Sequence, residues 1–201
     1  MNPRVALALG LVGAFALGAI VVAAASRDEG EAPSGDAPRS FEGATLPPRL
    51  RAPDFALRNQ DGERVSMRAL RGRAAIVTFL YTTCEDSCPG QAQQIKGGLD
   101  ELGHDVPALA ISVDPPGDSP ARARRFLFDA GMTGRMDFVL GSRAQLEPLW
   151  RAYAIQPQSD DAEHQARIVL IDREGFQRVG YPLEQATPER IAHDLALLER
   201  E

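Results

Sequence analysis

Three short segments of this 201-residue chain are apolar at almost every position, and they restrict its fold more than any other feature. They are 74–81 (AAIVTFLY), 107–113 (PALAISV) and 167–171 (RIVLI), and a shorter segment lies at 137–140. A strand exposed on one face alternates apolar and polar residues, whereas a strand covered on both faces is apolar throughout. The segments therefore predict a central sheet that is buried on both faces, as parallel sheets are.

Amphipathic segments that fit helices separate these strands. Apolar residues recur at helical spacing after Cys88, after Ser119-Pro120, after Ser142 and after Thr187-Pro188. Serine and threonine are favoured N-caps, and proline suits the first helical position. Strands that alternate with helices of this length indicate an α/β domain. Ahead of them, Asp61-Gly62 between two short strand-like segments predicts a β-hairpin.

The N-terminus carries an uncharged apolar run at residues 5–25, and about 20 such residues cross a bilayer. Arg4 precedes the run and several acids follow it, so the positive-inside rule places the N-terminus in the cytoplasm and the rest outside. We favour an uncleaved anchor, although the alanines before Ser26 leave cleavage by a signal peptidase open. The predicted organisation is a membrane anchor or signal segment at 1–25, a flexible linker at 26–50 and a globular domain at 51–201.

Charge and composition exclude several classes of protein. Lys and Arg number 22 against 28 Asp and Glu, and the net charge of −6 argues against a nucleic-acid footprint. Two cysteines and three histidines are too few for a multi-finger zinc protein or a disulfide-rich scaffold.

The two cysteines, Cys84 and Cys88, lie where the first buried strand ends and the first helix begins. Ligands collect at the carboxyl ends of strands in open α/β sheets, and a helix N-terminus stabilises thiolates. The spacing lets both sulfurs form a disulfide or chelate one soft metal ion, and the adjacent acids Glu85 and Asp86 favour neutral thiols or a bound cation. A structural disulfide is the alternative, but closing so short a loop removes little chain entropy.

The histidines are harder to assign from the sequence. His164 lies in a polar loop just before the strand at 167–171, and it faces the cysteines only if that strand is antiparallel. The turn-forming sequence 172–175 supports a hairpin and hence an antiparallel strand. On the residues alone His164 also fits a solvated loop histidine, and we expect His104 and His193 to be surface residues.

These segments together resemble the Sco/SenC family, membrane-anchored thioredoxin-like proteins that deliver copper to cytochrome c oxidase. The family's strand ending in Cys-x-x-x-Cys-Pro matches 78–89, and its Val-Asp-Pro-x-x-Asp-Thr/Ser-Pro segment matches 113–120. Its metal-binding histidine matches His164, six residues before Leu170. The chain departs from the family at Glu85, where proline is usual, and at Gln165, where serine or threonine is usual.

The resemblance implies a thioredoxin-like mixed sheet flanked by helices, with an N-terminal hairpin and one membrane-spanning segment. It implies that Cys84, Cys88 and His164 bind copper, and two thiolates and an imidazole form a soft ligand set that suits Cu(I). Whether Cu(I), Cu(II) or both are the bound form stays open on the sequence. A disulfide between the cysteines would expel the metal. The partner implied is the copper-accepting subunit of cytochrome c oxidase, and the location implied is a bacterial inner membrane with the domain in the periplasm.

Two other functions stay open on the sequence. One is a periplasmic thiol–disulfide oxidoreductase that keeps partner cysteines reduced through Cys84 and Cys88, and the other is a copper or redox sensor. A peroxiredoxin is unlike this chain, since Tyr81 and Val77 stand where such a site has Thr or Ser and Pro. We therefore expect a metallochaperone rather than an enzyme.

Overall fold

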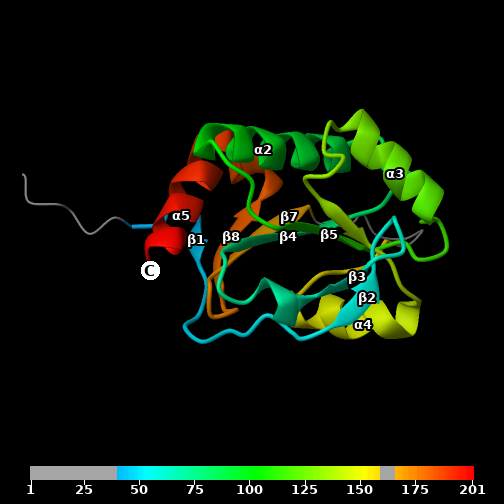
Figure 1. Ribbon diagram of the computed structural model, residues 1–201, viewed down its shortest axis with the longest axis horizontal. Coiled ribbons are helices and arrows are strands. Elements are labelled where there is room, and N and C mark those ends of the chain that lie inside the picture. The colour runs from blue at the N-terminus through cyan, green and yellow to red at the C-terminus, as the bar shows by residue number, and fades with distance from the viewer. Residues whose placement is uncertain (1–39, 159–165) are drawn as a thin grey trace, which may run out of the picture. The chain divides into compact units, whose positions relative to one another are not determined.

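A computed structural model describes residues 40–158 and 166–201, and a six-stranded mixed sheet forms the centre of this part (Figure 1). In spatial order the strands are β1 (Ala44–Thr45), β8 (Gln177–Pro182), β7 (Arg167–Ile171), β4 (Ala75–Leu80), β5 (Ala108–Ser112) and β6 (Asp137–Val139). β4, β5 and β6 are parallel, whereas β7 pairs antiparallel with both β4 and β8. The predicted mixed sheet and the antiparallel direction of the strand at 167–171 are confirmed.

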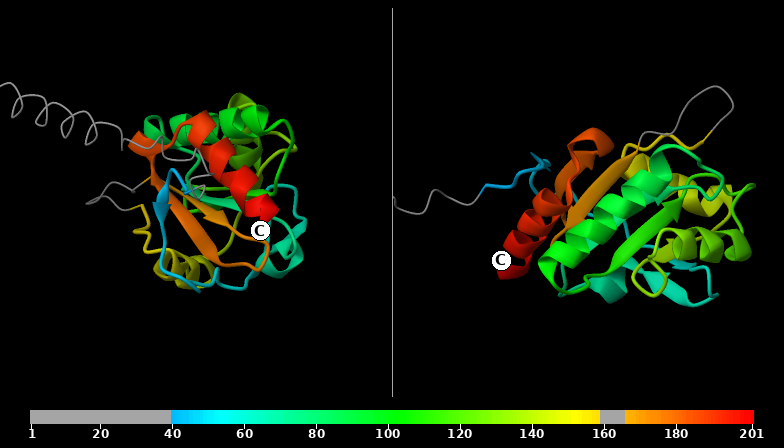
Figure 2. Two further views of the ribbon diagram at one scale, coloured as in Figure 1. Left: turned by 90° about the vertical axis from the view of Figure 1, so that its left-hand side faces the viewer. Right: turned by 90° about the horizontal axis from the view of Figure 1, so that it is seen from above.

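One layer of elements covers each face of the sheet (Figures 1 and 2). One layer holds α2 (Ser87–Leu102), α3 (Pro120–Asp129) and α5 (Pro188–Arg200). The other holds α4 (Arg143–Ala152), the 3-10 turn η1 (Met67–Leu70) and the predicted hairpin of β2 (Ala56–Arg58) and β3 (Arg64–Ser66). A second 3-10 turn, η2 (Leu183–Gln185), leads from β8 towards α5.

β4 is buried at all six positions because its side chains alternate between these two layers. Ile76 and Leu80 pack among the residues of α2 and α5, while Val77 and Phe79 pack among those of α4 and the hairpin. Each such burial stabilises the fold by about 1.5–3 kcal/mol. The strand that leads to the cysteines is therefore fixed from both sides.

Two glycines in the second half of α2 allow this helix to pack closely against α5. A Cβ on Gly97 would lie 2.6 Å from Cγ of Pro188, and a Cβ on Gly98 would lie 2.6 Å from Cγ2 of Ile191. Glycine costs a helix up to about 1 kcal/mol relative to alanine, and the close contact with α5 explains its presence here.

One compact unit runs from Phe41 to Glu201, and it includes residues 41–50 of the segment 26–50, which the sequence predicts to be a flexible linker. Residues 44–45 form β1 at the edge of the sheet, and the backbone N–H groups of Glu42 and Gly43 donate to the buried carboxylate of Asp194 at 2.8 and 2.9 Å. The composition of this segment gave no indication of the strand, because both β1 residues are exposed and its anchor lies about 150 positions away.

The predicted anchor at residues 5–25 lies outside the described residues. Within residues 40–158 and 166–201, no helix has both the length and the apolar character that a membrane span needs.

Candidate metal centre

The two cysteines lie together where β4 passes into α2. Cys84 is in the loop that follows β4, and Cys88 is the second residue of α2. Asp86, the N-cap residue, makes no side-chain capping bond, and the backbone N–H of Cys88 instead donates to Sγ of Cys84 at 3.2 Å. Sγ of Cys84 therefore accepts a bond that an N-cap oxygen normally takes, which holds the loop sulfur against the helix N-terminus. Both cysteines are free thiols.

The cysteines differ in their access to solvent. Cys88 is 0% exposed and Cys84 is 7% exposed. Cys84 also lines a hollow of about 420 Å³ between the start of α2 and α3, and Cys88 does not. A molecule that approaches this site therefore meets Cys84 first.

The pKa values of the two cysteines shift in opposite directions. A hydrogen bond from the Cys88 thiol, opposed by burial, lowers the pKa of Cys84 to about 5. The same bond and burial raise the pKa of Cys88. Burial, followed by a hydrogen bond to Cys84, raises the pKa of Tyr81. At neutral pH the reduced site thus holds one thiolate at Cys84, flanked by two protonated groups.

A partly buried carboxylate fixes the loop that carries Cys84. Asp118 accepts hydrogen bonds from the backbone N–H of Thr82 at 2.7 Å and from Oγ of Ser112 at 2.5 Å. Burial raises the pKa of Asp118, and the bonds from Ser112 and Thr82 oppose that shift. Asp118 therefore ties the loop after β4 to the end of β5. From the sequence, Asp118 was recognised only as part of the segment 113–120, and no role was predicted for it. Its position just after a buried strand is the feature that could have indicated this role.

The histidines are distributed as follows. His104 is exposed and pairs with Glu199 at 2.9 Å, which confirms it as a surface residue. His193 is half-exposed and contacts the buried Asp194, so it takes part in holding the N-terminal segment. His164 lies outside the described residues. Among the described residues, no group of three or more His, Cys, Asp and Glu side chains is arranged to hold a metal ion.

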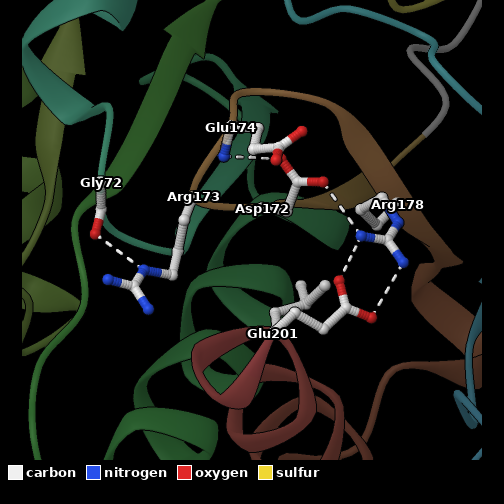
Figure 3. A pocket seen from close by; sticks show the side chains of 7 residues that line it. Gly72, Asp172, Arg173, Glu174, Arg178 and Glu201 are labelled. Atoms are coloured by element: carbon white, nitrogen blue, oxygen red, sulfur yellow. Dashed lines mark hydrogen bonds and ion pairs between the residues drawn. The ribbon is translucent and has the colours of Figure 1, made fainter.

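A second hollow, of about 380 Å³, lies at the opposite end of the sheet (Figure 3). Gly72, just before β4, and Asp172, just after β7, line it. Arg178 bridges Asp172 and Glu201 there, and Arg173 donates to the carbonyl of Gly72. Three of its charged residues, Asp172, Arg178 and Glu201, pair with one another, and neither cysteine lines it.

Comparison with known proteins agrees with this geometry. The SCO1/SenC family model matches residues 44–199. The chain belongs to the SCO1/SenC family. A SCO1 protein homolog of Bacillus subtilis is 28% identical over 144 residues, which cover 67% of this chain and 75% of that protein.

Two solved structures show the same fold. ScoI of Bradyrhizobium japonicum, with copper bound, is 30% identical, with a TM-score of 0.63 over 74% of this chain and 99% of that one. BsSco, a member of the Sco family of cytochrome c oxidase assembly proteins in which a disulfide switch was identified, is 24% identical, with a TM-score of 0.68 over 78% of this chain and 98% of that one.

Proposed function

We propose that this SCO1/SenC domain binds one copper ion through Cys84 and Cys88 and transfers it to the copper site of cytochrome c oxidase. The observation that carries the proposal is the pair of free sulfurs at the carboxyl end of β4, held together at a helix N-terminus. Thiolates are soft ligands that suit Cu(I). The copper bound by the related ScoI supports copper as the cargo.

His164 is the proposed third ligand. β7 runs antiparallel to β4, with Ile168 opposite Thr78, so its first residue, Arg167, lies at the same edge of the sheet as the cysteines. His164 comes three residues before Arg167 in the chain. An imidazole added to two thiolates would complete a trigonal set for Cu(I) and add the nitrogen donor that Cu(II) favours.

The tether is the second part of the proposal. Residues 5–25 would anchor the chain in the bacterial inner membrane, with the domain in the periplasm. Tethering raises the effective concentration of the domain near a membrane-embedded acceptor. The copper-accepting subunit of the oxidase is the acceptor we propose.

Anaerobic Cu(I) titration of the reduced protein, with the disulfide form as the control, tests the copper site. We expect one copper per reduced chain and none per oxidised chain, because a disulfide leaves no thiolate. Cys84→Ser and Cys88→Ser should each lose tight binding, since a hydroxyl is a hard, poorly ionised ligand. Equal stoichiometry in the reduced and oxidised forms would refute the proposal.

A matched histidine series tests the third ligand. His164→Ala should weaken Cu(I) binding modestly and abolish or strongly shift the thiolate-to-Cu(II) charge-transfer absorption. His104→Ala and His193→Ala should leave that absorption unchanged. An unchanged spectrum in His164→Ala would leave the cysteines alone as the site.

One observation favours a second function, thiol–disulfide reduction. The accessible Cys84 is the thiolate and the buried Cys88 is the thiol, which is the arrangement of an attacking and a resolving cysteine. Cys84 would attack a partner disulfide to form a mixed disulfide. Cys88 would then displace the partner as a reduced dithiol and leave a Cys84–Cys88 disulfide. Accumulation of the mixed disulfide in Cys88→Ser is the measurement that checks this route.

A further inference from the structure

The helix α3 forms one wall of the hollow that reaches Cys84. Arg122, Arg125, Phe126 and Asp129 line it from α3, at the spacing of one helical stripe, and Pro89 and Gln93 line it from α2. Figure 2 shows α3 beside α2 in the view from above. Since Cys84 lines the hollow and Cys88 does not, a partner that exchanges a ligand with the site must approach beside this stripe.

The stripe is positively charged in a chain that is acidic overall. The residues of α3 that line the hollow include two arginines and one aspartate, against a net charge of −6 for the whole chain, and the third arginine of the helix, Arg124, pairs with Asp61 instead. Arg122 donates to the carbonyl of Gly117 at 2.6 Å and has no carboxylate partner among the described residues. Arg125 is 74% exposed and pairs only with Asp129, one turn along the same helix. Such exposed pairs contribute little to stability, so these arginines are open to an external anion.

An exposed aromatic side chain continues the same surface. Phe128 is 68% exposed, and the only other large hydrophobic side chain of the described residues that is exposed is Leu50, at 36%. The guanidinium carbon of Arg125 lies 5.8 Å from the centre of the Phe128 ring. Arginine and aromatic residues are enriched at protein interfaces and carry much of their binding energy. We call Arg122, Arg125 and Phe128 the α3 surface.

The charges on the other side of Cys84 have the opposite sign. Glu85 and Asp86 are exposed in the loop before α2, and neither lines the hollow. A partner that approaches Cys84 therefore meets positive charge on the α3 side and negative charge on the loop side. Charge patterns of this kind fix the orientation of an encounter and raise its rate.

We propose that the α3 surface docks an acidic surface of the copper-accepting protein, with an apolar side chain of that protein against Phe128. The inference rests on the proposed function and adds the chemistry of the partner and the side from which it approaches. Docking there brings the ligands of the acceptor to Cys84, the accessible sulfur, so copper leaves by exchange at Cys84 first.

Stopped-flow measurement of copper transfer tests this docking proposal. The donor is the Cu(I)-loaded full-length chain, the acceptor is the copper-free copper-accepting domain of the oxidase, and the rate is measured at several salt concentrations. We expect the wild-type rate to fall with salt, and the double variant Arg122→Glu/Arg125→Glu to transfer at least about tenfold more slowly at low salt, without that dependence. Phe128→Ser should slow transfer less, by the same factor at every salt concentration. Arg200→Glu is the matched control, because it reverses the charge of an exposed residue at the C-terminal end of α5. This variant should transfer copper at the wild-type rate.

Copper stoichiometry is measured for every variant and should remain one per chain. Equal transfer rates for wild type and the double variant would overturn the inference and leave the proposed function intact. A wild-type chain that binds copper and transfers none at any salt concentration would overturn both. A wild-type dimer that dissociates in Arg122→Glu/Arg125→Glu would assign the α3 surface to a second copy of the chain and overturn the acidic acceptor.

Discussion

The two ends of the central sheet carry hollows of similar volume, about 420 Å³ beside Cys84 and about 380 Å³ beside Arg178. Their chemistry differs. At the first end both cysteines are buried, with Sγ of Cys84 accepting from the N–H of Cys88, and the partly buried carboxylate of Asp118 holds the loop. At the second end Arg178 pairs with the buried carboxylate of Asp172 and with the exposed carboxylate of Glu201. Neither volume nor the burial of a carboxylate separates the two ends, whereas the pair of buried thiols is found at the first end alone among the described residues.

The same contrast appears along α2. The loop before it carries Cys84 and its first turn carries Cys88, while its second half packs through Gly97 and Gly98 onto α5. The N-terminus of α2 thus belongs to the thiol site, and its second half serves to pack against α5. Changes at the first should alter thiol chemistry and metal binding, and changes at the second should alter only stability.

The largest expected effect is on the thiol pair. Removing the hydrogen bond from Cys88 in Cys88→Ala should raise the pKa of Cys84 from about 5 towards the ordinary thiol value of about 8.5. Cys88→Ser keeps an O–H donor and should shift the pKa less. Thiolate absorbance followed against pH measures both, and Glu201→Gln, at the other end, should titrate like wild type. An unshifted midpoint in Cys88→Ala would contradict the assigned bond.

The next effect concerns Asp118. Cutting its side chain back in Asp118→Ala leaves the buried hydroxyl of Ser112 and the partly buried N–H of Thr82 without this acceptor, at a cost of about 1–3 kcal/mol for the hydroxyl and less for the N–H. Asp118→Asn keeps a similar shape without the charge. Urea unfolding of the reduced protein measures the free energy of unfolding of each variant.

The pH dependence of Asp118→Asn separates charge from shape. Burial raises the pKa of Asp118, so the folded state binds a proton more tightly than the unfolded state. Its contribution to wild-type stability therefore falls as pH rises from the unfolded pKa through the raised folded pKa. Because the asparagine side chain does not titrate, the stability of Asp118→Asn relative to wild type should rise with pH over that window. If the free energy of unfolding of wild type and of Asp118→Asn varied with pH in the same way, the raised pKa of Asp118 would be contradicted.

The sequence predicted the cysteine end well because its determinants are local. The apolar run of β4, the loop and the start of α2 are continuous in the chain, so pattern and spacing place Cys84 and Cys88 correctly. The direction of β7 also followed from a local turn. These features depend on neighbours along the chain.

The parts that were missed depend on contacts between distant residues. β1 is two exposed residues held by Asp194, and Asp118 acts on Thr82, which lies 36 positions earlier. The α3 surface needs the placement of α3 beside α2. Periodicity and spacing carry no information on such pairings, which only the assembled sheet provides.

A smaller effect is expected from the glycines of α2. Alanine is about 1 kcal/mol better than glycine in a helix, but at Gly98 its methyl group would meet Ile191 and overpacking costs about 1–3 kcal/mol. Gly98→Ala should therefore lower the free energy of unfolding by about 1 kcal/mol. Gly90→Ala is the matched control, since nothing lies within 4 Å of its Cβ, and it should stabilise the protein. If Gly98→Ala and Gly90→Ala changed the free energy of unfolding in the same direction, this account would be wrong.

The smallest effect is expected at the ion pairs of the opposite end. Arg178 contacts Asp172 at 3.0 Å and also pairs with Glu201, and its side chain is partly exposed. Asp172 keeps its hydrogen bonds from the backbone N–H groups of Glu174 and Phe176 when the arginine is removed. Arg178→Met should therefore lower the free energy of unfolding by at most about 1 kcal/mol, and by less at high salt because screening weakens the wild-type pairs. Urea unfolding at two salt concentrations measures this, and Cu(I) titration of the same variant should still give one copper per chain. A loss of copper binding in Arg178→Met would show that the two ends of the sheet are coupled.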